Sequence, residues 1–171
     1  MKAPPIEVHI FTDGSCYPNP GPGGWAAILL HVETRTEKEV VGKEVLTTNN
    51  RMELFAVIAG MQALTRPAAI RVFSDSRYVT RLVGKWNNGE HAHSLSGKYE
   101  QNNWRKGDGN FPANLDMLKL LTKEAKRHLY IDCEWIRGHT GHDYNERCDE
   151  LAGTARKAAA ELKRETNAND S

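Results

Sequence analysis

The sequence has few cysteines, no long apolar run and almost no net charge. Its three cysteines, Cys16, Cys133 and Cys148, form no Cys-x-x-Cys pair. Their odd number argues against a disulfide framework and favours a reducing, cytoplasmic location. No apolar stretch approaches the roughly 20 residues that span a membrane, and residues 1–5 lack the apolar segment of a secretion signal. We therefore expect no association with a membrane.

The charges balance almost completely, with 23 basic against 22 acidic side chains in 171 residues. The overall field therefore cannot attract a polyanion, and binding of nucleic acid would require a local patch of basic side chains. A chain of this length can bury a substantial core, and no internal repeat divides it. We expect a single domain over residues 1–171.

The periodicity of apolar residues predicts an alternation of strands and helices. A strand from residue 6 to Asp13 is followed by strands at 25–31 and 38–46, a buried helix at 51–64, a strand at 69–73, a helix at 77–83, a helix near 115–121, a strand at 129–136 and a helix from Asp143, with Asp143 and Glu146 spaced as in a capping box. This order predicts the α/β class, with a five-stranded mixed sheet, three antiparallel strands followed by parallel ones, and helices on both faces. Residues 84–112 lack periodicity and predict an irregular insertion, and residues 166–171 predict a flexible tail.

Four acidic residues occupy positions that a purely structural role seldom explains. Asp13 and Asp75 each end a predicted strand before small residues, Glu53 lies in the first turn of the buried helix, and Asp149 lies close to the apolar face of the last helix. Taken singly, each has an ordinary explanation: a turn residue, a helix cap, an acid favoured by the helix dipole, or a solvated helix residue. These explanations do not account for four such acids in one short chain.

The chemistry of such a group depends on whether the four carboxylates converge. Two carboxylates about 4 Å apart repel by roughly 4 kcal/mol at an effective dielectric constant of about 20. A cluster therefore binds protons or cations, and ligands that are all oxygen favour Mg²⁺ or Mn²⁺ over zinc. Two such ions suit the attack of water on a phosphodiester.

Four blocks of sequence, in order, resemble the bacterial type 1 ribonuclease H family (RNase HI), within the ribonuclease H-like superfamily. They cover the chain from about residue 7 to 154 apart from the insertion: Thr12-Asp13-Gly14-Ser15 with Asn19-Pro20-Gly21-Pro22-Gly23-Gly24, Thr47-Thr48-Asn49-Asn50-Arg51-Met52-Glu53-Leu54, Ser74-Asp75-Ser76-Arg77-Tyr78-Val79, and Trp135-Ile136-Arg137-Gly138-His139-Thr140-Gly141-His142 with Asn145-Glu146-Arg147-Cys148-Asp149-Glu150-Leu151-Ala152. The insertion departs from the family, whose bacterial members carry a strongly basic protrusion there. Here it has four basic against three acidic residues.

The resemblance implies a ribonuclease H fold and an endonuclease that cuts the RNA strand of RNA/DNA hybrids, leaving 5′-phosphate and 3′-hydroxyl ends. Such enzymes remove RNA primers and R-loops. The resemblance implies two Mg²⁺ ions, replaceable by Mn²⁺, with Asp13, Glu53, Asp75 and Asp149 as metal ligands. His139 would assist proton transfer or product release, although the residue alone also fits an ordinary loop histidine.

The resemblance also implies a set of residues that contact the hybrid, and a monomeric protein. Amide and hydroxyl groups at a minor groove can detect 2′-hydroxyls without reading the base sequence. The implied contacts are Asn19, Thr48, Asn49, Gln62, Trp86, Trp104 and Asn145. His142 is expected to be structural, and the pair His91 and His93 is expected to be a solvated loop segment.

Two other functions remain open at this point. A related carboxylate nuclease, such as a 3′ exonuclease, would use the same acids, but the Gly-His-Thr-Gly-His loop argues against it. A hybrid-binding domain without activity is a different class, and the retention of all four acids and His139 argues against it.

Overall fold

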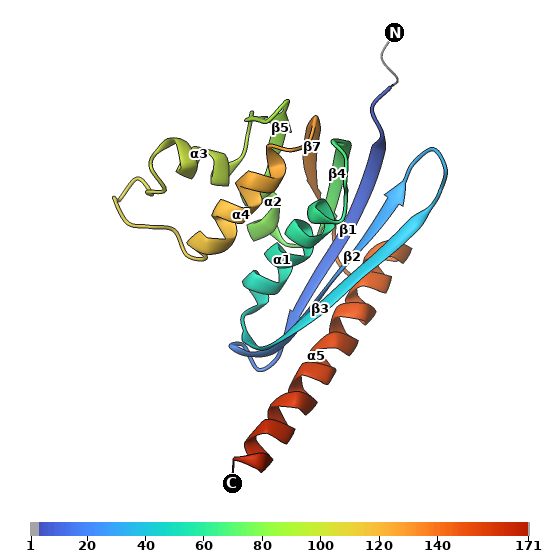
Figure 1. The fold of residues 1–171 in the computed structure, drawn as a ribbon, viewed down its shortest axis with the longest axis vertical. Coiled ribbons are helices and arrows are strands. Elements are labelled where there is room, and N and C mark those ends of the chain that lie inside the picture. The colour runs from blue at the N-terminus through green and yellow to red at the C-terminus, as the bar shows by residue number, and fades with distance from the viewer. Residues whose placement is uncertain (1–3, 171) are drawn as a thin grey trace.

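A mixed sheet of seven strands forms the centre of the computed structural model, which describes residues 4–170 (Figure 1). The strands lie in the order β3-β2-β1-β4-β7-β5-β6. β1 pairs antiparallel with β2 and parallel with β4, and β4 pairs parallel with β7. Their bounds are β1 Glu7–Cys16, β2 Gly21–His31, β3 Glu37–Thr47, β4 Ala69–Ser74, β5 Lys85–Asn87, β6 Glu90–His91 and β7 Tyr130–Trp135. The parallel pair brings the carboxyl ends of β1 and β4 to the same edge of the sheet.

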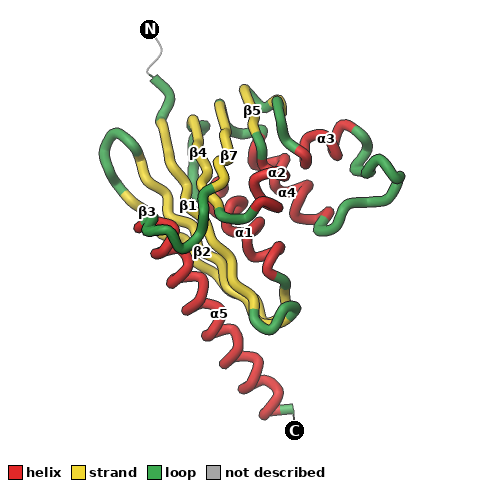
Figure 2. Tube along the Cα trace, turned by 180° about the vertical axis from the view of Figure 1, so that it is seen from behind, coloured by secondary structure: helices red, strands yellow, loops and turns green. Residues whose placement is uncertain are grey.

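Helices cover both faces of this sheet, as Figure 2 shows from behind. The side chains of β2 alternate: Ala27 and Leu29 pack in the main core with α1, whereas Ala26 and Ile28 pack against α5. Because both faces are covered, every residue of β2 except the last is buried. The helices are α1 Asn49–Gln62, α2 Arg77–Val83, α3 Leu95–Gln101, α4 Leu115–Ala125 and α5 Asp143–Asn169.

The predicted α/β class, mixed sheet and helices on both faces are confirmed, but the predicted number of five strands was too low. The two additional strands, β5 and β6, and the helix α3 all lie within residues 84–112, which we expected to be irregular. β5 pairs antiparallel with β7 and places the Trp86 ring, which is 1% exposed, in the main core. A strand of three residues is too short for periodicity to reveal.

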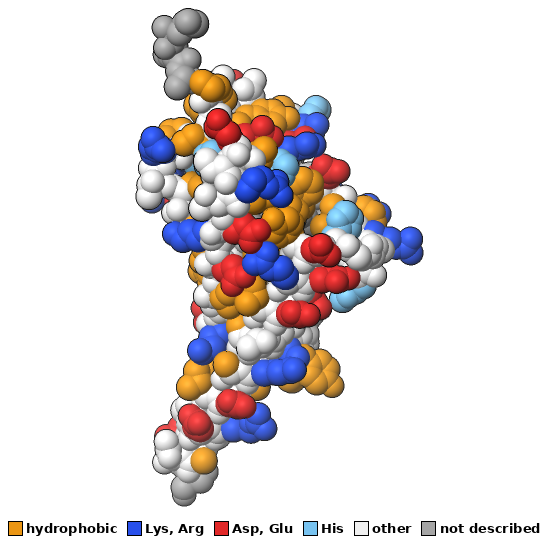
Figure 3. Space-filling view, turned by 90° about the vertical axis from the view of Figure 1, so that its right-hand side faces the viewer, with side chains coloured by type: hydrophobic (Ala, Val, Ile, Leu, Met, Phe, Trp, Pro, Cys, Tyr) orange, Lys and Arg blue, Asp and Glu red, His pale blue; other side chains and the backbone are white. Residues whose placement is uncertain are grey.

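The C-terminal tail also differs from the expectation. α5 continues to Asn169, so residues 166–169 are helical, and its C-terminal part projects beyond the sheet (Figure 1). The molecule is correspondingly narrow at this end (Figure 3). The capping box predicted at Asp143 is absent, because His142 is the N-cap residue and makes no side-chain hydrogen bond to the helix. The N-terminal residues 1–3 and Ser171 lie outside the described residues. Within residues 4–170, no helix combines the length and the apolarity needed to cross a membrane.

Candidate active site

Asp13 stands on the last part of β1, on the face of the strand that α5 covers. It is 6% exposed, and its Oδ1 accepts a 2.9 Å hydrogen bond from the Gly14 backbone N–H. The side chains of a strand alternate between its faces, so Gly14 points toward α1. A Cβ on Gly14 would lie 2.3 Å from the Glu53 backbone nitrogen. The missing side chain therefore lets α1 touch the strand beside Asp13.

Glu53 enters the site from α1. Thr48 is the N-cap residue, so Glu53 is the fifth residue of the helix and lies beyond the first turn in which we placed it. The macrodipole acts mainly within that turn, so it does not explain this acid. One of its carboxylate oxygens lies within 4.8 Å of an oxygen of Asp13, while its Oε2 is buried without a partner in the described residues. A buried carboxylate oxygen that lacks a partner is suited to a cation.

Asp75 follows the end of β4. The N-cap of α2 is Ser76, whose Oγ accepts a 3.2 Å hydrogen bond from the Val79 N–H, so Asp75 is not the cap. One oxygen of Asp75 comes within 4.8 Å of oxygens of Asp13 and Glu53, a spacing that can hold a metal ion. A Cβ on Gly138 would lie 2.6 Å from Asp75 Oδ2, so the loop that carries His139 passes directly over this carboxylate.

Asp149 and His139 lie at the edge of this group. Both side chains are exposed, and Asp149 lies outside the three-residue cluster, which is the one such group among residues 4–170. Their charges nevertheless reach it. Burial is the main cause that raises the pKa of Asp13 and of Asp75; the charge of Asp149 adds to both increases, and that of His139 opposes the increase at Asp75. The cluster thus has three close carboxylates and a fourth within electrostatic range.

Burial and mutual repulsion raise the pKa values of the clustered acids. Burial, followed by the charge of Asp75, raises the pKa of Asp13 to about 7. Burial and the Asp13 carboxylate raise the pKa of Glu53 well above its ordinary range, and burial also raises that of Asp75. The donor set is entirely oxygen, which fits Mg²⁺ or Mn²⁺. A divalent cation bound there would replace the protons that these acids otherwise retain.

These pKa values predict how cations stabilise the protein. An acid whose pKa is raised by folding contributes stability at low pH that is lost as pH rises through its folded pKa, here about 7 for Asp13. Added Mg²⁺ relieves the repulsion at high pH but must displace protons at low pH. We expect MgCl₂ to raise the melting temperature, relative to EDTA, more at about pH 8.5 than at about pH 5.5. An equal effect at both values in thermal melts would contradict the protonated cluster.

A second group of predicted residues lies where β1, the loop at residues 17–20 and the start of α1 meet. The Asn49 N–H donates to Asn19 Oδ1 at 3.2 Å, and the Cys16 N–H donates to Asn49 Oδ1 at 2.7 Å. Thr48 Oγ1 accepts from the Arg51 N–H at 3.3 Å. The structure therefore brings Asn19, Thr48 and Asn49 together, with Asn19 and Asn49 exposed to solvent.

The remaining predicted contacts are scattered. Asn145 is 3% exposed at the start of α5, and its Nδ2 has no hydrogen-bond partner in the described chain. Trp104 is half-buried beside the Lys119 ammonium. Gln62 is exposed but lies nine residues after Glu53, about 13 Å farther along α1, and this position does not support its predicted contact. Trp86 donates its indole N–H to the Val83 carbonyl inside the core, so the prediction that it touches substrate is wrong.

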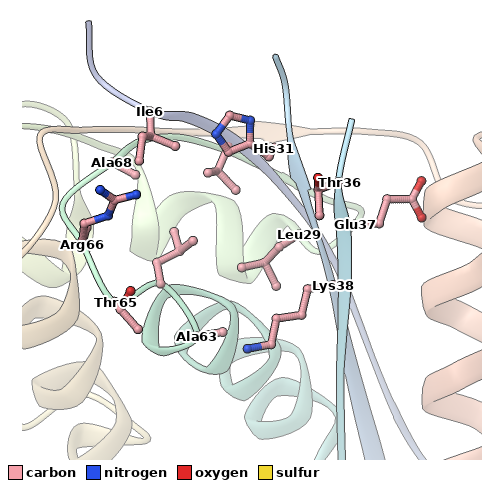
Figure 4. Close-up of a pocket in the computed structure, with 12 residues that line it drawn as sticks. Ile6, Leu29, His31, Thr36, Glu37, Lys38, Ala63, Thr65, Arg66 and Ala68 are labelled. Atoms are coloured by element: carbon pink, nitrogen blue, oxygen red, sulfur yellow. The ribbon is translucent and has the colours of Figure 1, made fainter. Parts of the chain in front are cut away.

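A groove of about 230 Å³ lies at the opposite end of β1 and α1 (Figure 4). Ile6, Leu29 and Ala63 contribute apolar atoms to it. Glu37 points away from it toward α5 (Figure 4), where it accepts hydrogen bonds from Tyr144 and Arg147. The groove contains none of the predicted site residues, so it is separate from the carboxylate cluster.

This fold, with acids clustered at the adjacent ends of two parallel strands, defines a nuclease of the ribonuclease H-like class. The RNase H family model matches residues 5–157. The ribonuclease H of Granulibacter bethesdensis is 48% identical over 149 residues, covering 87% of this chain and 91% of that protein. That of Proteus mirabilis is 46% identical over 155 residues, covering 91% and 87%. The crystal structure of LC9-RNase H1, described as a type 1 RNase H with the type 2 active-site motif, superposes with a TM-score of 0.73 at 26% identity, covering 93% of this chain and 76% of that one. The chain belongs to the RNase H family.

Proposed function

We propose that this protein cuts the RNA strand of RNA/DNA hybrids internally and leaves 5′-phosphate and 3′-hydroxyl ends. The observation that carries the proposal is the approach of Asp13, Glu53 and Asp75 to within 4.8 Å of one another, in a chain of the RNase H family. Removal of RNA primers and R-loops follows from such an activity. We expect it to act as a monomer.

The carboxylates would hold two Mg²⁺ ions, replaceable by Mn²⁺, with Asp149 as the fourth ligand. Bound there, the ions would supply activation of the attacking water and stabilisation of the charge on the leaving oxygen. His139, exposed on the loop over Asp75, would move a proton at the leaving 3′ oxygen or assist product release. Because the four carboxylates come from four separate segments, β1, α1, the end of β4 and α5, the tertiary fold sets their spacing.

Amide and hydroxyl side chains would hold the substrate beside this cluster. Asn19 and Asn49, fixed by their hydrogen bond to each other, present polar groups at the loop next to β1. Thr48 would receive a phosphate of the DNA strand, and the Asn145 side chain, whose Nδ2 has no partner among residues 4–170, would meet the minor groove. Hydroxyl and amide contacts of this kind detect 2′-hydroxyls without selecting a base sequence.

The test compares substrates under matched conditions. End-labelled RNA/DNA hybrid, single-stranded RNA and duplex DNA are incubated with the protein in MgCl₂, with and without EDTA. We expect internal cuts in the RNA of the hybrid alone, and none in EDTA. Products released only from a 3′ end would favour an exonuclease, and binding without any cutting would favour an inactive hybrid-binding domain.

A further inference from the structure

Arg156, at the middle of α5 where the helix packs against β1 and β2, is a cation that the sequence reasoning missed. Its side chain is half-buried, and its Nε donates a 3.0 Å hydrogen bond to Ser15 Oγ. Within residues 4–170 it forms no ion pair with a carboxylate. By contrast, Arg147 on the same helix binds Glu37 and Glu39 of β3. The positive charge of Arg156 is therefore available to a negatively charged ligand.

The position of Arg156 is fixed by the closest approach of α5 to the sheet. A Cβ on Gly24 would lie 2.4 Å from the Ala152 carbonyl oxygen and 2.5 Å from the Arg156 nitrogen. Gly24 pairs directly with Ser15 in the ladder between β1 and β2. The backbone of the helix thus lies against this pair of residues, and the Arg156 side chain extends across it from β2 to β1.

This place is adjacent to the carboxylate cluster. Ser15 is two residues after Asp13 on the same face of β1, a separation of about 7 Å along the strand. On the helix, Arg156 is seven residues after Asp149, two turns along the same face, or about 10 Å. Burial raises the pKa of the neighbouring Cys16 thiol, and the charge of Arg156 acts in the opposite direction, so its field reaches the end of this strand.

We propose that Arg156 binds a backbone phosphate of the RNA strand immediately next to the phosphate that is cut. The inference rests on the proposed function, since the cluster at Asp13 must receive the scissile phosphate. The proposal requires the next phosphate of the same strand to lie beyond Asp13 in the direction of Ser15. Ser15 Oγ accepts the hydrogen bond of Arg156 Nε and so fixes the arginine side chain. Both terminal nitrogens of the guanidinium are then left to bind phosphate oxygens. Ser15 is a positioning residue in this arrangement.

Arg156 could otherwise serve only to tie α5 to β1, and kinetics separate the two roles. We expect Arg156→Gln to raise KM for a hybrid about fivefold, equivalent to roughly 1 kcal/mol of binding, with kcat within about twofold. In a plot of log(kcat/KM) against log salt concentration, the slope should become less steep by about 0.9, the amount for one phosphate contact. Lys157→Gln, an exposed neighbour on α5, is the matched control. An unchanged KM and salt slope in Arg156→Gln, with its melting temperature preserved, would overturn the proposal.

Neutralising single phosphates makes the test independent of stability. A methylphosphonate is placed at either RNA phosphate that flanks one defined cut. With the methylphosphonate at one of these positions, the kcat/KM of the wild-type protein should fall about fivefold. The kcat/KM of Arg156→Gln should not fall further at that position. The kcat/KM of Ser15→Ala should still fall there, because Arg156 is present. Equal sensitivity of wild type and Arg156→Gln at both positions would show that Arg156 binds neither phosphate. Failure of the wild type to cut the unmodified hybrid would instead contradict the proposed function.

Discussion

Asp13→Asn should lower hybrid cleavage by at least about 1,000-fold and at the same time raise the melting temperature in EDTA. The amide retains the shape of the side chain and can still accept the hydrogen bond from the Gly14 N–H. It removes the negative charge that a divalent cation requires. It also removes an acid whose pKa is raised to about 7, so the metal-free folded state holds one crowded carboxylate fewer.

Two measurements check this prediction: single-turnover cleavage of a labelled hybrid in MgCl₂, and thermal melts in EDTA at about pH 8.5, where the wild-type acid is ionised. Asp170→Asn, the same change at an exposed residue after α5, is the control and should alter neither quantity. Cleavage at the wild-type rate would contradict the metal-site assignment. A lower melting temperature in EDTA would contradict the repulsion within the cluster.

The sequence could predict the positions of the acids because each interrupts a regular pattern. Asp13 and Asp75 end strands, and parallel pairing of β1 with β4 then brings their carboxyl ends together. Glu53 stands among apolar residues of α1, which marked it as unusual. What the sequence could not supply was the distance between them, because that depends on how closely α1 and β1 pack.

The errors have a common physical origin in contacts between residues distant in sequence. Trp86 looked like an isolated loop aromatic, but pairing of β5 with β7 places its ring in the core. Arg156 carried only a weak signal, its spacing of seven residues from Asp149. Its contact with Ser15 spans 141 positions of the chain. The periodicity of apolar residues describes one helix or strand at a time and contains no information on which segments pair with one another.

Packing between α1 and β1 can be tested directly at Gly14. A methyl group there would lie 2.3 Å from the Glu53 nitrogen and 2.6 Å from the Met52 carbonyl carbon, both backbone atoms that cannot rotate away. α1 must move, and Glu53 moves with it. We expect Gly14→Ala to cost about 3 kcal/mol of unfolding free energy. Cleavage should fall at least about 100-fold, because a shift of about 1 Å in a catalytic group has an effect of that size.

Urea unfolding and single-turnover cleavage of the hybrid measure the two effects separately. Gly107→Ala is the matched control, since a Cβ there meets no atom within 4 Å, and it should leave both quantities near wild type. A Gly14→Ala protein with wild-type stability and rate would show that α1 can retreat from β1 without cost. If Gly14→Ala remains folded but binds Mg²⁺ more weakly than wild type by calorimetry, the displaced group is Glu53, because Asp13 and Asp75 are held by their own strands. The distance between one helix and one strand would then set the geometry of the whole carboxylate cluster.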